Sequence, residues 1–99
     1  MDLNKLQQRA IQVRAMYSQL EQNNYGQSWN TTDLALGFVG DVGDLMKLIM
    51  AREGKRVIED CDQKLAHELS DCFWSILVLA NIMNIDLEKS FIETMDLVE

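Results

Sequence analysis

The chain of 99 residues contains no proline, two cysteines and one histidine. Without proline, no position forces a helix to break, and no stretch of the chain has the composition of a linker between domains. Cys61 and Cys72 would lie about 16 Å apart on one helix, which is too far for a disulfide. The cysteine spacing fits no zinc motif. We therefore expect residues 1–99 to form a single domain without disulfides or structural zinc.

Basic residues are also few, with nine Lys and Arg against 16 Asp and Glu and a net charge of −7. This balance argues against a partner that is a nucleic-acid polymer, because phosphate backbones attract basic patches. An apolar fraction of 47% and a charged fraction of 25% exclude disorder of the whole chain. A domain this short buries only about 60–65% of its unfolded surface, so oligomerisation is expected.

Long apolar runs are missing. The longest, Cys72–Met83, is interrupted by Ser75 and Asn81 and is shorter than the roughly 20 residues that a membrane span needs. It predicts a buried helix and no membrane partner. The first residues lack the apolar segment of a secretory signal, so we expect a cytoplasmic protein.

Apolar residues at helical spacing predict four helices, over residues 3–23, about 31–53, 61–83 and 87–98. In the first, the seam Leu3, Leu6, Ala10, Val13, Tyr17 and Leu20 repeats at steps of three and four. Asn30, Thr31 or Thr32 could cap the second helix, and Asp86 the fourth. The third helix has a wide apolar arc that predicts burial on more than one side. The expected fold is an all-α bundle of four to five helices per chain.

Four carboxylates interrupt these apolar helices. Asp41 and Asp44 are three residues apart in the second helix, and Glu68 and Asp71 are three apart in the third. A short loop makes the two helices antiparallel. Asp44 and Glu68 then lie about 14 and 10 Å from the turn, and Asp41 and Asp71 about 18 and 15 Å. The four acids therefore fall at similar heights on facing helices.

Carboxylates gathered in this way repel one another unless a cation lies between them. A site with oxygen ligands alone favours Mg²⁺, with Mn²⁺ as the alternative, whereas Zn²⁺ prefers His or Cys ligands. His67 points about 100° around its helix from Glu68. The competing interpretation is that each acid pair belongs to an ordinary solvated helix face.

Residues 34–45, Leu-Ala-Leu-Gly-Phe-Val-Gly-Asp-Val-Gly-Asp-Leu, followed by His-Glu-Leu-Ser-Asp at 67–71, resemble the MazG-like nucleotide pyrophosphohydrolases, an all-α family. The resemblance covers about residues 29–87. Its pattern is E-E-x-x-E in one helix and E-x-x-D in the next. It implies that Asp41, Asp44, Glu68 and Asp71 hold Mg²⁺. It also implies hydrolysis of ribo- or deoxynucleoside triphosphates, non-standard ones included, to monophosphate and pyrophosphate.

The same resemblance implies a homodimer or homotetramer, with Asp41 or Glu68 orienting or deprotonating the attacking water. Two features depart from the family pattern. Gly40 replaces the first Glu, and Asp41 and Asp44 are each one methylene shorter than Glu. The alternative function is therefore a catalytically weak or inactive module that senses nucleotides or binds proteins. A purely structural role for the acids predicts that metal has no effect on stability.

Few side chains could contact the remainder of a nucleotide. Lys64 shares the face of Glu68, and Lys55 and Lys47 are the next candidates for the phosphates, although each could be a solvated surface lysine. Trp74 and Trp29 could stack on a base, and both could equally serve packing.

Three glycines, Gly37, Gly40 and Gly43, recur at steps of three in the second expected helix. Each costs roughly 1 kcal/mol relative to Ala. Their retention in a helix indicates close approach by another helix or by a ligand.

Overall fold

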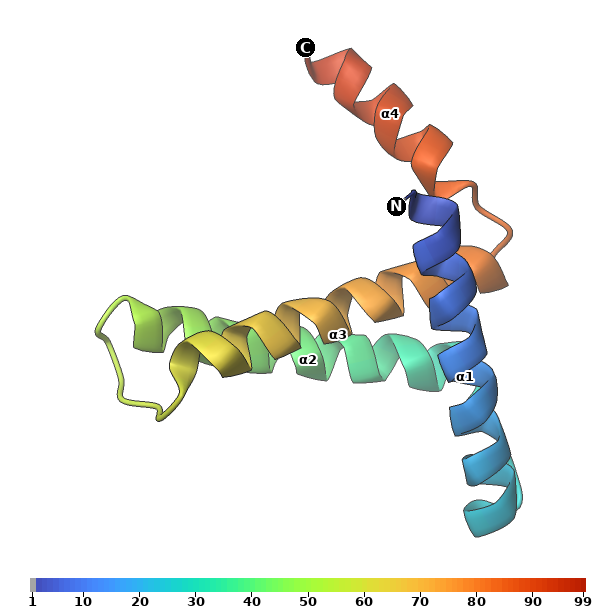
Figure 1. Ribbon diagram of the computed structural model, residues 1–99, viewed down its shortest axis with the longest axis horizontal. Helices are drawn as coiled ribbons and strands as arrows, with labels where there is room; N and C mark the ends of the chain where they lie inside the picture. Colours follow the sequence, from blue (N-terminus) through green and yellow to red (C-terminus); the bar gives the residue numbers. More distant parts are fainter. Residues whose placement is uncertain (1) are drawn as a thin grey trace.

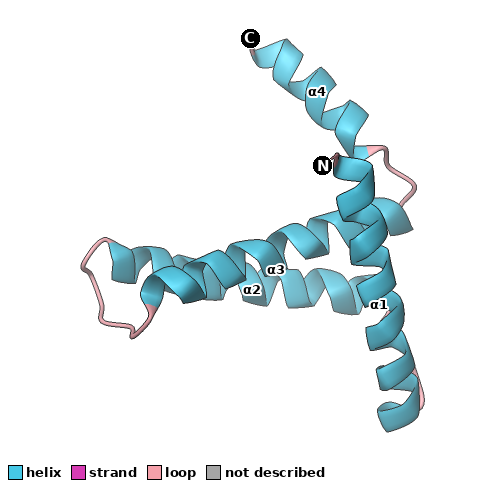
Figure 2. Cartoon of the chain, in the orientation of Figure 1, coloured by secondary structure: helices cyan, strands magenta, loops and turns pink. Residues whose placement is uncertain are grey.

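The computed structural model describes residues 2–99, which form four α-helices and no strand (Figures 1 and 2). They are α1 (Leu3–Tyr25), α2 (Thr31–Arg52), α3 (Cys61–Ile82) and α4 (Leu87–Val98). The prediction of an all-α fold is confirmed, and every helix boundary lies within two residues of its expected position.

Local signals at the helix ends explain these boundaries. Asn30 and Asp33 form a reciprocal capping box at the start of α2. The Asp86 carboxylate accepts a hydrogen bond from the Lys89 backbone at the start of α4. Gly26, with φ +78°, ends α1, and Gly54, with φ +82°, lies just beyond α2. These conformations favour glycine because it has no Cβ.

Helices α2 and α3 lie side by side as an antiparallel hairpin (Figure 1). The inward positions of α2 follow one another at steps of three and four: Leu34, Phe38, Asp41, Leu45 and Leu48. Those of α3 do the same: Leu65, Glu68, Cys72 and Ser75. All of these residues are buried or half-buried. Two carboxylates therefore occupy positions that, apart from Ser75, apolar residues fill elsewhere along the seam between the helices.

Helix α1 crosses the end of the hairpin where α2 begins and α3 ends (Figure 1). The core at this crossing consists of Ala10, Leu34, Leu77 and Val78. Trp74 of α3 adds a hydrogen bond from its indole Nε1 to the carbonyl oxygen of Ala10, at 3.2 Å. Its ring also meets the ring of Tyr17 edge-on, with centroids 5.9 Å apart.

The predicted burial of α3 on several sides is only partly observed within one chain. Leu69, Phe73, Ile76 and Met83 remain 39–56% exposed, because α2 and α1 are the helices that make extensive contact with α3. On α1, Ala10 of the expected seam is buried, whereas Leu20 is half-exposed. Helix α4 projects away from the hairpin (Figure 1), and none of its residues, 87–98, is buried.

Within residues 2–99, no single helix has both the length and the apolarity needed to cross a membrane. Helices α3 and α4 meet that criterion only as a pair, and the chain bends by 107° between them. Buried helices of protein cores can meet the same criterion, so this is weak evidence of a span.

Candidate metal centre

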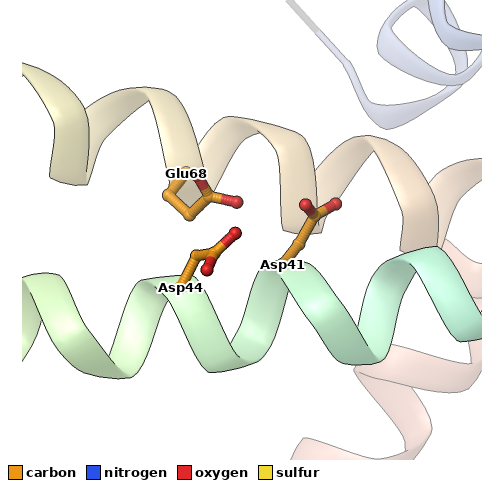
Figure 3. Close-up of side chains that lie close together, drawn as sticks. All are labelled: Asp41, Asp44 and Glu68. Atoms are coloured by element: carbon orange, nitrogen blue, oxygen red, sulfur yellow. The ribbon is translucent and has the colours of Figure 1, made fainter.

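Three of the four carboxylates singled out in the sequence converge between α2 and α3. Asp41, Asp44 and Glu68 each offer one oxygen, and these three oxygens lie within 4.8 Å of one another (Figure 3). Asp41 and Asp44 are nearly one helical turn apart on α2, so their side chains share a face. Glu68 approaches from α3 at the same height. The antiparallel hairpin thus brings together residues that are 24 or more positions apart in the chain.

The three acids differ in their exposure to water. Asp41 and Glu68 are half-buried in the seam, whereas the side chain of Asp44 is 61% exposed. Partial burial raises the pKa of Glu68 above its ordinary value of 4.5. A hydrogen bond with Asp41 and the negative charges of Asp41, Asp71 and Asp44 raise the pKa further. Without a cation, Glu68 therefore binds a proton up to a higher pH than an isolated glutamate does.

The fourth expected ligand, Asp71, does not join the other three. Its carboxylate lies 3.2 Å from Nε2 of His67, one turn earlier on α3. Its charge still contributes to the raised pKa of Glu68, so it lies within electrostatic reach of the centre. His67 itself is mostly exposed and is not part of the three-carboxylate group. Asp71 is thus placed beside the group and not within it.

The donor set fits a hard divalent cation. All three donors are carboxylate oxygens, the ligands that Mg²⁺ and Mn²⁺ prefer. In an octahedral Mg²⁺ site, opposite ligands lie about 4.2 Å apart, since each metal–oxygen distance is about 2.1 Å. Neighbouring ligands in such a site lie about 3.0 Å apart, so oxygens that are within 4.8 Å of one another would have to move closer together to bind one ion. Half-exposed Asp44 leaves an open side, where water or a substrate oxygen could complete the coordination.

A hollow of about 380 Å³ opens beside the carboxylates. It is lined by Asp44, Lys47, Leu48, Ile58, Gln63, Lys64, His67 and Glu68. Lys47 and Lys64 thus border the same hollow as two of the acids. Lys47 also lies 4.0 Å from the Asp44 carboxylate. Lys55, the other candidate for binding phosphates, is not among the lining residues.

Ile58 and Gln63 line this hollow without having been singled out in the sequence. Ile58 belongs to the loop between α2 and α3, and Gln63 to the first turn of α3. No motif marks either residue. Their positions depend on the path of the loop, which local spacing does not encode.

The two tryptophans have different surroundings. Trp74 is tied to α1 through Ala10 and Tyr17, which is a packing role. Trp29 is 50% exposed and borders a second hollow of about 560 Å³. The nearest atom of its ring lies 3.7 Å from where a Cβ on Gly37 would be. Because Gly37 precedes Asp41 by one helical turn, Trp29 lies about 6 Å farther along α2 from the acids.

The backbone of Trp29 is fixed from both sides. Its N–H donates to the Glu21 carboxylate at 2.6 Å, and the Arg14 guanidinium donates to its carbonyl oxygen at 2.6 Å. Arg14 and Glu21 also pair with each other at 3.4 Å. Hydrogen bonds therefore hold in place the backbone that carries the exposed indole ring.

Both cysteines are free, as their expected separation required. Cys72 is buried in the seam next to the acids. Burial raises the pKa of its thiol, and the negative charges of Asp41, Glu68 and Asp71 raise it further. The thiol therefore stays protonated near neutral pH and is a poor soft ligand for a metal.

Comparisons with protein-family models, with curated proteins and with solved structures found no match.

Proposed function

We propose that this chain is a Mg²⁺-dependent nucleotide pyrophosphohydrolase that resembles the MazG-like family. It would hydrolyse ribo- or deoxynucleoside triphosphates to monophosphate and pyrophosphate. The observation that carries the proposal is the convergence of Asp41, Asp44 and Glu68 across the α2–α3 hairpin. Those are three of the four positions at which the motif resemblance expects metal ligands.

In this proposal Asp41, Asp44 and Glu68 hold the cation. Bound there, Mg²⁺ would neutralise charge on the phosphate oxygens as the α–β anhydride breaks. Glu68 and Asp41 are half-buried, and their carboxylate oxygens lie within 4.8 Å of each other. Whichever of them is less engaged by the metal is positioned to orient or deprotonate the attacking water.

The rest of the nucleotide has two places to bind. Lys64 and Lys47, which border the 380 Å³ hollow, would contact phosphate oxygens that the cation leaves free. The exposed ring of Trp29 offers a stacking surface for a base at the next turn of α2. Trp74 is already engaged by α1 and has no part in this proposal.

The test is release of pyrophosphate from a panel of ribo- and deoxynucleoside triphosphates, with Mg²⁺ or Mn²⁺. Asp44→Asn and Glu68→Gln should each abolish release. The matched controls are Asp96→Asn and Glu93→Gln on α4, which remove the same charges from exposed positions far from the group. Release that survives Asp44→Asn and Glu68→Gln would refute the proposal.

A second function, nucleotide binding without turnover, is favoured by one residue. Gly40 stands where the family pattern has its first Glu. No described atom outside its own helix backbone and chain neighbours lies within 4 Å of a Cβ placed there, so lack of space does not explain the glycine. A chain that binds a triphosphate with Mg²⁺ yet releases no pyrophosphate would support this function.

A further inference from the structure

The second hollow, of about 560 Å³, lies beside the connection between α1 and α2. It is lined by Tyr25, Gln27, Ser28, Trp29, Asp33, Leu36 and Gly37. Asp33 and Gly37 fall on the side of α2 that also carries Asp44, since these positions follow one another at steps of four and seven. Gly37 precedes Asp44 by about 10 Å along the helix, a distance that the sugar and first phosphate of a nucleotide can span.

Hydrogen bonds hold two parts of this lining in place. The main chain of Trp29 is fixed by Arg14 and Glu21, an ion pair whose side chains are only 15% and 13% exposed. The carboxylate of Asp33 is fixed by the capping box, in which its Oδ2 accepts the N–H of Asn30 at 3.0 Å. The backbone that carries an exposed aromatic ring and a neighbouring carboxylate are therefore in position before a ligand binds, as in a preformed ligand site.

The charges at the two hollows set the direction in which a nucleotide would lie. Among the described residues that line the second hollow, none is basic and Asp33 is acidic, so phosphates are repelled there. The first hollow is lined by Lys47 and Lys64. The phosphates therefore belong beside the lysines, and the base belongs beside Trp29 and Asp33.

The chemistry of Asp33 distinguishes one base from another. An ionised carboxylate only accepts hydrogen bonds, and it has lone pairs for about four of them. The capping box uses one, so acceptors remain for the edge of a base. Guanine presents two neighbouring donors, its ring N1–H and its 2-amino group, which match the two oxygens of a carboxylate. Uracil and thymine present a single N3–H between two carbonyl oxygens, which a carboxylate repels.

We propose that Asp33 is a specificity-determining residue that selects a guanine base stacked on Trp29. The inference rests on the proposed function, because it takes the base to belong to the nucleotide that would be hydrolysed. It adds a substrate class, since guanine nucleotides are bound more tightly than those of uracil or thymine. Hypoxanthine keeps the N1–H of guanine but lacks the 2-amino group, so it falls between guanine and uracil.

The test is a titration of the full chain, without metal, with the monophosphates of guanosine, inosine and uridine (GMP, IMP and UMP). Binding is followed by the indole N–H signal of Trp29 in NMR spectra, which Trp74→Phe distinguishes from the second indole. The three ligands share their phosphate and sugar, so differences among their dissociation constants report the base. GMP should bind about five- to tenfold more tightly than UMP, with IMP between them.

Asp33→Asn should remove the preference for GMP over UMP. The matched control is Asp86→Asn, which removes the same charge from the residue that caps α4 and should keep the preference. Helix content from circular dichroism shows whether Asp33→Asn folds. If it does not, Asp33→Gln replaces it, since glutamine at this position of a capping box still accepts the N–H of Asn30.

Monophosphates cannot release pyrophosphate, so this titration separates the inference from the proposed hydrolysis. A preference for GMP in a chain that hydrolyses no triphosphate would support the inference and count against hydrolysis alone. Equal binding of the three nucleotides, or no change in the Trp29 signal with any of them, would overturn the inference even if pyrophosphate is released from triphosphates. A preference that persists in the folded Asp33 variant, or that is lost equally in Asp86→Asn, would overturn it as well.

Discussion

The carboxylates of Asp41 and Glu68 approach each other across the α2–α3 hairpin, and partial burial, together with the interaction with Asp41, raises the pKa of Glu68. Both side chains occupy inward positions of the seam, where Leu45 and Leu65 stand a turn away. An apolar pair at these positions would stabilise the hairpin more. The two acids therefore lower the stability of the metal-free protein at the place where a bound cation would raise it.

Stability should fall with rising pH in the absence of metal. Because the pKa of Glu68 is raised in the folded state, the folded chain binds more protons than the unfolded chain above pH 4.5. The free energy of unfolding should therefore decrease from about pH 4.5 up to the raised pKa and then level off. Denaturant unfolding without metal should show this decrease in the wild type. Glu68→Gln should lack it and be more stable than the wild type at pH 7.

Adding Mg²⁺ should make the wild type more stable than Glu68→Gln at pH 7. The metal binds the deprotonated carboxylates, so its stabilisation of the wild type should grow as pH rises through the same range. At a concentration a hundred times the dissociation constant, it should stabilise the wild type by about 2.7 kcal/mol. Glu68→Gln should gain almost none of this. Equal stabilisation of both proteins would place the metal elsewhere.

Gly40→Glu should increase turnover. The position has room for a side chain, and the change restores the acidic pattern that the family resemblance implies. Glutamate is also a better helix former than glycine by roughly 0.5–1 kcal/mol, so the variant should fold. Steady-state rates of pyrophosphate release would be compared with those of Gly40→Gln, which has the same shape without the charge. A rate that does not rise, or that rises equally in both, would contradict a role for the missing carboxylate.

Lys64→Met and Lys55→Met should behave differently. Lys64 borders the hollow beside the acids, whereas Lys55 does not. Losing one charge-assisted contact to a phosphate should reduce kcat/KM by roughly 10- to 100-fold. Lys55→Met, which removes the same charge from the neighbouring loop, should change kcat/KM by less than about twofold at physiological salt. Equal effects of the two changes would indicate a general effect of net charge.

Trp74→Phe should affect stability and leave nucleotide hydrolysis unchanged. The substitution keeps an aromatic ring but loses the hydrogen bond to Ala10, which should cost about 1 kcal/mol. Trp29→Ala should do the reverse, raising KM with little change in stability, since its ring is half-exposed. The free energy of unfolding and the KM would be measured for both variants. A raised KM in Trp74→Phe would show that the packing assignment is wrong.

Sequence reasoning was most successful where the signals are local. The capping residues Asn30 and Asp86 and the terminal glycines Gly26 and Gly54 act within one turn, so helix boundaries could be predicted closely. The meeting of Asp44 with Glu68 followed from counting residues on each side of one short loop.

Other features depend on contacts that spacing does not encode. Asp71 has the right height on α3, but its carboxylate lies against His67 and not with the other three acids. The apolar arc of α3 was expected to be buried on more than one side. The chain bends by 107° between α3 and α4, a direction that spacing along either helix does not encode, and Phe73 and Ile76 remain partly exposed.

The most direct test of the central claim is binding of Mn²⁺ to the purified chain, followed by electron paramagnetic resonance at pH 7. The wild type should bind Mn²⁺ until its sites are saturated, which lowers the concentration of free Mn²⁺, and Mg²⁺ should compete for the same sites. Asp44→Asn should weaken binding by at least about tenfold, because it removes one of three charged ligands. Asp96→Asn, which loses the same charge on α4, should bind as the wild type does. Equal affinity in Asp44→Asn and Asp96→Asn would contradict a metal centre formed by Asp41, Asp44 and Glu68.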